Sequence, residues 1–143
     1  MYDDILVPTD GSEGTDRVLD HAVEVAAEGA TVHGLYVVDR EVYLATAKED
    51  QDAVIEELRT EGERAVDAVA DAAGAAGLDA ETAVVDGVPH RAVLEYVDEA
   101  AIDLVVMGTH GRSGRDRVVM GSVTERVVGS ADVPVLTVRI GED

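Results

Sequence analysis

The segment from Gly108 to Ser122 contains the residues of this 143-residue chain that are best suited to bind a ligand. Gly108, Gly111 and Gly114 follow a strand-like apolar run at three-residue intervals. Glycine lets backbone N–H groups close on phosphate oxygens and readily adopts a positive φ. Gly121 and Ser122 then open a helix-like stretch, whose free N–H groups and positive dipole end attract anions. The segment therefore predicts a phosphate-binding site.

The charge of this segment is opposite to that of the whole chain. The sequence has 31 Asp and Glu, 11 Lys and Arg, and a formal net charge of −20. Between Gly108 and Gly129, by contrast, four arginines outnumber two acids; the arginines are Arg112, Arg115, Arg117 and Arg126. A locally positive segment in an acidic chain favours a phosphate ligand, because the repulsion is reversed there.

Structural roles would account for the same residues. Glycines after a strand often form only a tight turn, and arginines often lie on solvated faces. Ser122 to Glu125 (SVTE) also matches the S-x-x-E capping box, in which Ser122 caps a helix and binds no ligand. Two standard nucleotide motifs are absent from the sequence. The single lysine, Lys48, lies outside any P-loop, and the glycine spacing G-x-x-G-x-x-G differs from the dinucleotide fingerprint G-x-G-x-x-G.

The composition excludes several other classes of site. The chain has no cysteine, so disulfides, Cys-ligated zinc, iron–sulfur clusters and thiol nucleophiles are excluded. The histidines are scattered without metal-ligand spacing, at positions 21, 33, 90 and 110. His110 lies in the glycine segment, where an imidazole is chemically able to act as a general acid or base. Its spacing to other groups supports no such role, so we assign no catalytic residue.

The acidic composition also predicts partners and location. Nucleic acid and anionic membranes would be repelled, so neither is expected as a partner. No apolar run reaches the roughly 18 residues of a membrane span, and the acidic N-terminus does not look like a signal peptide, so we expect a cytoplasmic protein. One lysine beside ten arginines, with the excess of acids, is typical of salt-loving organisms. We expect a halophilic archaeon as the source, with an acidic mesophilic protein as the alternative.

Five β-branched runs alternate with helix-like stretches, which predicts a single α/β domain over residues 1–143 with a doubly wound parallel sheet. The expected strands cover residues 4–8, 31–38, 78–86, 103–107 and 133–140, with 78–86 at an edge. The expected helices cover residues 12–28, 50–76, 87–100 and 122–130. Gly29 is placed to end the first helix, and Gly62 and Gly74 should each weaken the second by about 1 kcal/mol. Residues 39–50 are polar and are interpreted as a loop.

The turn after the first strand, Thr9-Asp10-Gly11, is a second candidate for ligand contact. In open α/β sheets, ligands bind at the carboxyl ends of strands where the winding reverses. If the first and fourth strands are neighbours, this turn and the glycine segment meet in one crevice. Asp10 can then hydrogen-bond a ribose hydroxyl or face a metal ion. Its alternative role is to cap the following helix, with Glu13 three residues further on.

Motifs along the whole chain resemble those of the universal stress protein family. They are ILVPTDGSE at the first strand, LYVV at the second, Gly87-Val88-Pro89, DLVVMGTHG, GSVTERVV and the closing VPVLTVR. The spacing of Gly108, Gly111 and Gly121-Ser122 also matches G-x2-G-x9-G-[ST], the motif of the nucleotide-binding branch. The resemblance implies a Rossmann-like three-layer sandwich, with a five-stranded parallel sheet in the order 3-2-1-4-5 and helices on both faces.

The resemblance further implies an ATP site. We expect Mg²⁺ to accompany the ATP, with Asp10 as a candidate metal ligand. Adenine and ribose lie against the first-strand turn and the end of the second strand, at Pro8, Thr9, Asp10 and Val38. The phosphates lie against the glycine segment and the helix that follows it, at Gly108, His110, Gly111, Arg112, Gly114, Gly121, Ser122 and Val123. The resemblance also implies a homodimer paired through the last strand, at Val135, Leu136, Thr137 and Val138. The segment 39–50 varies in the family, and its role stays open.

Three functions are consistent with these features. The first is an ATP-binding regulatory protein of the stress response, which acts through its homodimer on an unknown protein partner. The second is an enzyme, a slow ATPase or a nucleotidyl transferase, although the sequence offers no obvious water-positioning base or arginine finger. The third is a nucleotide-free dimeric adaptor in which the glycines serve only as turns. Of these we favour the first.

Overall fold

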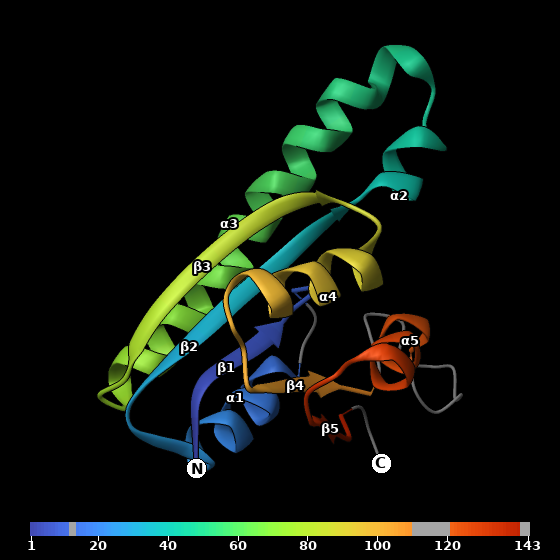
Figure 1. Ribbon diagram of the computed structural model, residues 1–143. Helices are drawn as coiled ribbons and strands as arrows, with labels where there is room; N and C mark the ends of the chain where they lie inside the picture. Colours follow the sequence, from blue (N-terminus) through green and yellow to red (C-terminus); the bar gives the residue numbers. More distant parts are fainter. Residues whose placement is uncertain (12–13, 110–120, 141–143) are drawn as a thin grey trace.

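A five-stranded parallel sheet forms the centre of the computed structural model, which describes residues 1–11, 14–109 and 121–140 (Figure 1). The strands are β1 (Tyr2–Pro8), β2 (Ala26–Asp39), β3 (Asp79–Gly87), β4 (Leu104–Gly108) and β5 (Val135–Val138). Their order is β3-β2-β1-β4-β5, and each pair of neighbours is parallel. The order implied by the family resemblance is therefore confirmed, as is the expectation that the third strand lies at an edge.

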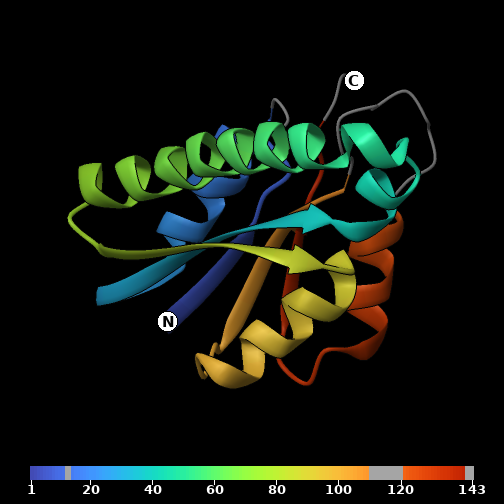
Figure 2. The same cartoon turned by 90° about the horizontal axis from the view of Figure 1, so that it is seen from above.

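Helices cover both faces of the sheet, as Figure 2 shows. On one face lie α1 (Thr15–Glu24) and α3 (Gln51–Ala75), and on the other lie α4 (Pro89–Glu99) and α5 (Ser122–Ser130). Successive residues of a strand point to opposite faces, so Ile5 and Val7 join the core under α1 and α3, while Leu6 joins the core under α4 and α5. Both faces of β1 are buried, as expected for a central parallel strand. In the described part of the chain, no helix is long and apolar enough to cross a membrane.

The first helix is shorter than its apolar pattern predicts. It begins at Thr15 and ends at Glu24, and β2 already starts at Ala26. Val25 and Ala26 match the helical spacing, but in the structure Val25 caps the end of α1 and Ala26 begins β2, and both pack against the same core. Gly29, expected to end the helix, instead lies inside β2 with a φ of 80°. It lies where the pairing with β1 shifts, because Tyr2 pairs with Ala26 whereas Asp4 pairs with Thr31.

Residues 39–50 form helical turns, so their interpretation as a loop is wrong. The segment contains the short helix α2 (Arg40–Leu44) and the 3-10 helix η1 (Lys48–Asp50). Asp39 caps α2, because its carboxylate accepts a hydrogen bond from the backbone N–H of Glu41 at 3.0 Å. In Figure 1, α2 lies beyond the carboxyl end of β2, beside the first turns of α3. The last strand is also shorter than predicted, since β5 covers only Val135–Val138.

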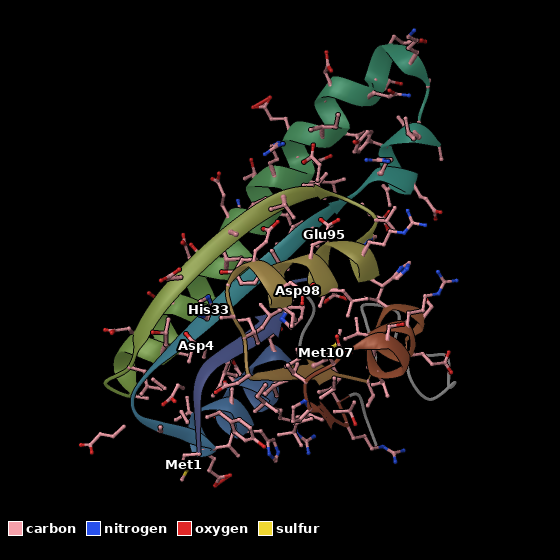
Figure 3. The ribbon with its side chains drawn as sticks, in the orientation of Figure 1. Met1, Asp4, His33, Glu95, Asp98 and Met107 are labelled. Carbon is pink, nitrogen blue, oxygen red and sulfur yellow. The ribbon has the colours of Figure 1, made fainter. Side chains whose placement is uncertain are left out.

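A buried histidine links three elements near the amino ends of the strands (Figure 3). His33 on β2 is 3% exposed. Its Nε2 lies 3.1 Å from Asp4 Oδ1 on β1, and its Nδ1 lies 2.8 Å from Tyr96 Oη on α4. An ionised carboxylate can only accept a hydrogen bond. When Asp4 is ionised and the imidazole is neutral, Nε2 of His33 therefore donates to Asp4, and the Tyr96 hydroxyl donates to Nδ1 of His33. Asp103 extends this cluster by accepting hydrogen bonds from the backbone N–H groups of Asp3 and Asp4, at 3.1 and 3.0 Å.

The Tyr96 hydroxyl makes the stability of the protein sensitive to alkaline pH. Burial raises the pKa of Tyr96 above its ordinary value of 10.0, and the nearby carboxylates of Glu81 and Asp4 add to the rise. Above about pH 10 the unfolded chain therefore loses a proton that the folded chain keeps, and the free energy of unfolding falls with pH. The stabilisation is complete below about pH 10 and is lost as the pH rises through the folded pKa. In urea unfolding between pH 8 and 12, the free energy of unfolding should fall less with pH in Tyr96→Phe than in the wild type or in Tyr43→Phe. An equal fall in all three proteins would contradict this assignment.

Candidate ligand-binding site

A pocket of about 560 Å³ lies at the carboxyl ends of β1, β2 and β4. Here the chain order of the strands reverses, because β1 has β2 on one side and β4 on the other. Open α/β sheets bind their ligands at this point, and the volume falls within the roughly 300–1,000 Å³ that is usual for small-molecule sites. β1 pairs with β4, and the sequence prediction of a crevice depended on this pairing of the first and fourth strands.

The turn after β1 forms one wall of the pocket, through Pro8, Thr9 and Asp10. The Thr9 N–H donates to the carbonyl of Leu35 at 2.9 Å, and the Gly11 N–H donates to the Thr9 hydroxyl at 3.1 Å. Gly11 has a φ of 80°, a conformation that glycine adopts without strain. Asp10 does not cap α1, which is a correction to the alternative role considered for it. The residue at the cap position of α1 is Gly14, with a φ of 98°.

The start of α5 forms a second wall, through Gly121, Ser122 and Val123 together with Gly108 at the end of β4. Two hydrogen bonds join β4 to α5. The Gly121 N–H donates to the carbonyl of Thr109 at 2.6 Å, and the hydroxyl of the buried Thr124 donates to the carbonyl of Gly108 at 2.9 Å. These bonds hold the end of β4 beside the first turn of α5. The first turn of α5 thus borders the pocket. Its backbone N–H groups have no hydrogen-bond acceptor within the helix.

The capping box considered as an alternative role for Ser122 does not form. Gly121 occupies the N-cap position of α5, and no side chain makes a capping hydrogen bond at this end of the helix. Ser122 is the first residue of α5 and is exposed at the pocket, so the S-x-x-E pattern lies one residue too late to act as a box. The structure therefore removes the structural role that competed with ligand contact at Ser122.

The third wall is apolar and comes from four different elements. It includes Val37 of β2, Val42 of α2, Leu58 of α3, and Pro89 and Val93 of α4. None of these residues was predicted as a site residue. Val42 and its helix were missed because residues 39–50 were interpreted as a loop, although an Asp at position 39 is a recognisable cap.

Val38, which was expected to contact the ligand, lies in the core instead. It is fully buried in a cluster with Tyr36, Ala65 and Val66. Val37 and Asp39, which flank Val38 and point to the other face of the strand, both line the pocket. Four further predicted site residues lie outside the described part of the chain: His110, Gly111, Arg112 and Gly114.

The charges of the pocket wall are unevenly distributed. In the part of the wall that the structure describes, the charged residues are Asp10 and Asp39, and there is no Lys, Arg or His. The Asp39 carboxylate is already used by the N–H of Glu41. Within residues 1–11, 14–109 and 121–140, no three His, Asp or Glu side chains come together as a metal site. The third wall, which is apolar, therefore suits the apolar part of a ligand, and the start of α5 suits an anionic part.

A doubly wound parallel sheet with a ligand-sized pocket at its switch point places the protein among the Rossmann-like α/β domains. The sequence profile of the universal stress protein family matches residues 1–139. The chain belongs to the universal stress protein family.

Relatives with similar sequences and structures agree with this assignment. Universal stress protein MJ0531 of Methanocaldococcus jannaschii is 37% identical over 141 residues, covering 97% of this chain and 83% of that protein. The solved structure of MJ0577 from the same organism superposes with a TM-score of 0.88 at 26% identity, covering 100% of this chain and 99% of the other. A universal stress protein solved in complex with cAMP is 29% identical, with a TM-score of 0.67 and coverage of 96% and 97%.

Proposed function

We propose that the protein binds an adenine nucleotide in this pocket and acts in the cytoplasm as a nucleotide-dependent regulatory protein of the stress response. The observation that carries the proposal is the division of the pocket between an apolar wall and the first turn of α5. A nucleotide has the same division, with a flat apolar base at one end and phosphates at the other. The cAMP complex of a relative at 29% identity supports the choice of adenine.

In the proposed arrangement, each part of the nucleotide meets a matching wall. The base lies against Val37 and the apolar wall, and the ribose hydroxyls face the carboxylate of Asp10. The phosphates accept hydrogen bonds from the Ser122 hydroxyl, from the backbone N–H groups of Ser122 and Val123, and from the glycine segment that precedes them. We propose ATP with Mg²⁺ as the physiological ligand. Magnesium usually takes phosphate oxygens, waters and one or two carboxylates, and Asp10 is the residue of the wall that fits this role.

We also propose that two chains pair through β5. This strand lies at the edge of the sheet, so one side of its backbone has no neighbouring strand within the described chain. An unpaired edge is a natural template for a second copy. The pairing residues would be Val135, Leu136, Thr137 and Val138. A dimer would allow nucleotide occupancy in one pocket to be communicated to the other chain and to an unknown protein partner.

Calorimetric titration with Mg-ATP and with AMP, in a buffer with molar potassium salt, tests the proposed site. The purified protein is first checked by mass spectrometry for bound nucleotide. We expect saturable binding of one nucleotide per chain. Gly111→Val, and Ser122→Ala combined with Arg112→Ala, should abolish it, whereas Ser130→Ala at the far end of α5 should leave it unchanged.

Other outcomes would favour the two alternatives. Folded, nucleotide-free protein that binds neither ATP nor AMP would contradict the proposal and leave the dimeric adaptor as the best interpretation. Nucleotide turnover clearly above the uncatalysed rate, lost on replacement of His110 or Asp10, would instead indicate an enzyme.

A further inference from the structure

We infer that Val42 on α2 contacts the base of the bound nucleotide and sets the affinity of the apolar end of the pocket. This inference rests on the proposed function and assigns a role to the segment 39–50, which lies outside the motif G-x2-G-x9-G-[ST]. The chemical group that Val42 would recognise is a flat heteroaromatic ring, and the phosphates would lie beyond its reach.

The exposure of Val42 is the first observation. Val42 lines the pocket and is 47% exposed. An apolar side chain that remains half exposed in a pocket wall gains stability when a ligand covers it. Leu44 lies on the same helix and is 58% exposed, but it does not line the pocket. The two residues therefore differ in location while sharing their helix and their apolar character.

The anchoring of α2 is the second observation, because a contact residue needs a fixed position. The Asp39 carboxylate holds the N–H of Glu41 at the start of the helix. Tyr43 packs into the buried cluster that contains Tyr36 and Val38. Past the helix, the side-chain amide of Gln51 donates to the carbonyl of Thr46 at 3.1 Å.

These contacts hold α2 at both ends and along one side. Tyr43 packs against the buried cluster, and its neighbour Val42 is left at the pocket. Asp39 is thus a positioning residue for Val42.

The location of Val42 within the pocket is the third observation. Tyr43, next to it in the chain, packs on the same cluster as Leu58 of α3, and the pocket lining also includes Val37 at the end of β2 and Pro89 of α4. These three lining residues are apolar, and none can neutralise a phosphate. The backbone N–H groups suited to phosphate belong to α5, on the far side of β1 from β2. Val42 should therefore affect the binding of a nucleoside and of a nucleotide by the same factor.

The experiment is a titration of wild type, Val42→Ala, Leu44→Ala and Ser122→Ala with adenosine and with AMP. We expect Val42→Ala to weaken both ligands about fivefold, equivalent to about 1 kcal/mol. Leu44→Ala should bind both as the wild type does. Ser122→Ala should weaken AMP and leave adenosine unchanged. Circular dichroism and the Tm of each variant confirm that it is folded in the assay buffer.

Several results would overturn the inference. Wild-type affinity in Val42→Ala would do so, as would equal losses in Val42→Ala and Leu44→Ala. A loss for AMP without a loss for adenosine would place Val42 at the phosphate end and contradict its assignment to the base. In each of these cases the wild type still binds AMP, so the proposed function stands. If the wild type binds neither ligand, the proposed function fails and the inference fails with it.

Discussion

Replacing Gly62 with alanine should lower the free energy of unfolding, although alanine is the better helix former. Gly62 lies in the middle of α3, where the sequence alone suggests that a glycine costs about 1 kcal/mol. A Cβ atom at this position would lie 2.5 Å from Cδ1 and 2.9 Å from Cγ of Tyr36. Both atoms belong to the fixed part of a ring that is only 5% exposed, so the ring has little room to move. Overpacking of this kind costs about 1–3 kcal/mol, which exceeds the gain in helix propensity.

Gly74 in the same helix provides a matched control. It is exposed, and a Cβ atom there would meet nothing within 4 Å. Gly74→Ala should therefore raise the free energy of unfolding, by up to about 1 kcal/mol, through helix propensity alone. Urea unfolding of the two variants beside the wild type should thus give changes of opposite sign. Stabilisation by both substitutions would show that Tyr36 can move aside and that Gly62 is not required for packing.

The fold could be predicted from the sequence because its signals are local and repeated. Each strand is a short β-branched run, and the buried ones are apolar on both faces, as Ile5, Leu6 and Val7 illustrate. The start of α5 at Ser122 agrees with the sequence prediction, and α4 starts at Pro89, two residues after the predicted start of that helix. The proline and the glycine before Ser122 are the local signals for these two boundaries. The end of α1 was misplaced, since an apolar residue such as Ala26 suits the same core from a helix or from a strand.

The site could be predicted only in part, because its walls come from residues far apart in the sequence. The first-strand turn and the start of α5 carry recognisable motifs, and both line the pocket. Leu58 and Pro89 give no such signal, since their role depends on how α3 and α4 cross the sheet. The contact between His33 and Tyr96 joins residues 63 positions apart, and nothing local to either one predicts it.

The surface of α3 shows how the excess of acidic residues is arranged. Glu63, Asp67 and Asp71 are all exposed and follow one another at four-residue intervals. Residues at this spacing are neighbours on a helix, and each like-charged pair costs about 0.2–0.5 kcal/mol at low ionic strength. An ion pair with Arg59 relieves the charge of Asp86 at the end of β3, at 2.8 Å, but that pair is itself exposed and therefore weak. Ion pairs leave the formal net charge of −20 unchanged, so this charge must be screened by dissolved ions.

Salt should therefore stabilise the folded protein strongly, in keeping with the proposed origin in a halophile. The screening length falls from about 10 Å at 0.1 M salt to about 3 Å at 1 M, which is shorter than the distance between neighbouring surface charges on a helix. Between 0.1 and 2 M KCl, we expect the free energy of unfolding to rise by an amount on the order of a few kcal/mol. The measurement is urea unfolding at a series of KCl concentrations at pH 7.

A charge-reduced variant separates screening from the general effect of salt on apolar burial, which also stabilises folded proteins. Glu63→Gln, Asp67→Asn and Asp71→Asn together remove the two like-charged pairs of the row and keep the shape of each side chain. At 0.1 M KCl the triple variant should be more stable than the wild type by about 0.4–1 kcal/mol, and at 2 M KCl the two should be equal. A difference that persists at 2 M would point to helix propensity or local packing. If the wild type showed no rise in stability with salt, the acidic surface would not be an adaptation to salt, and the acidic mesophilic alternative would be favoured.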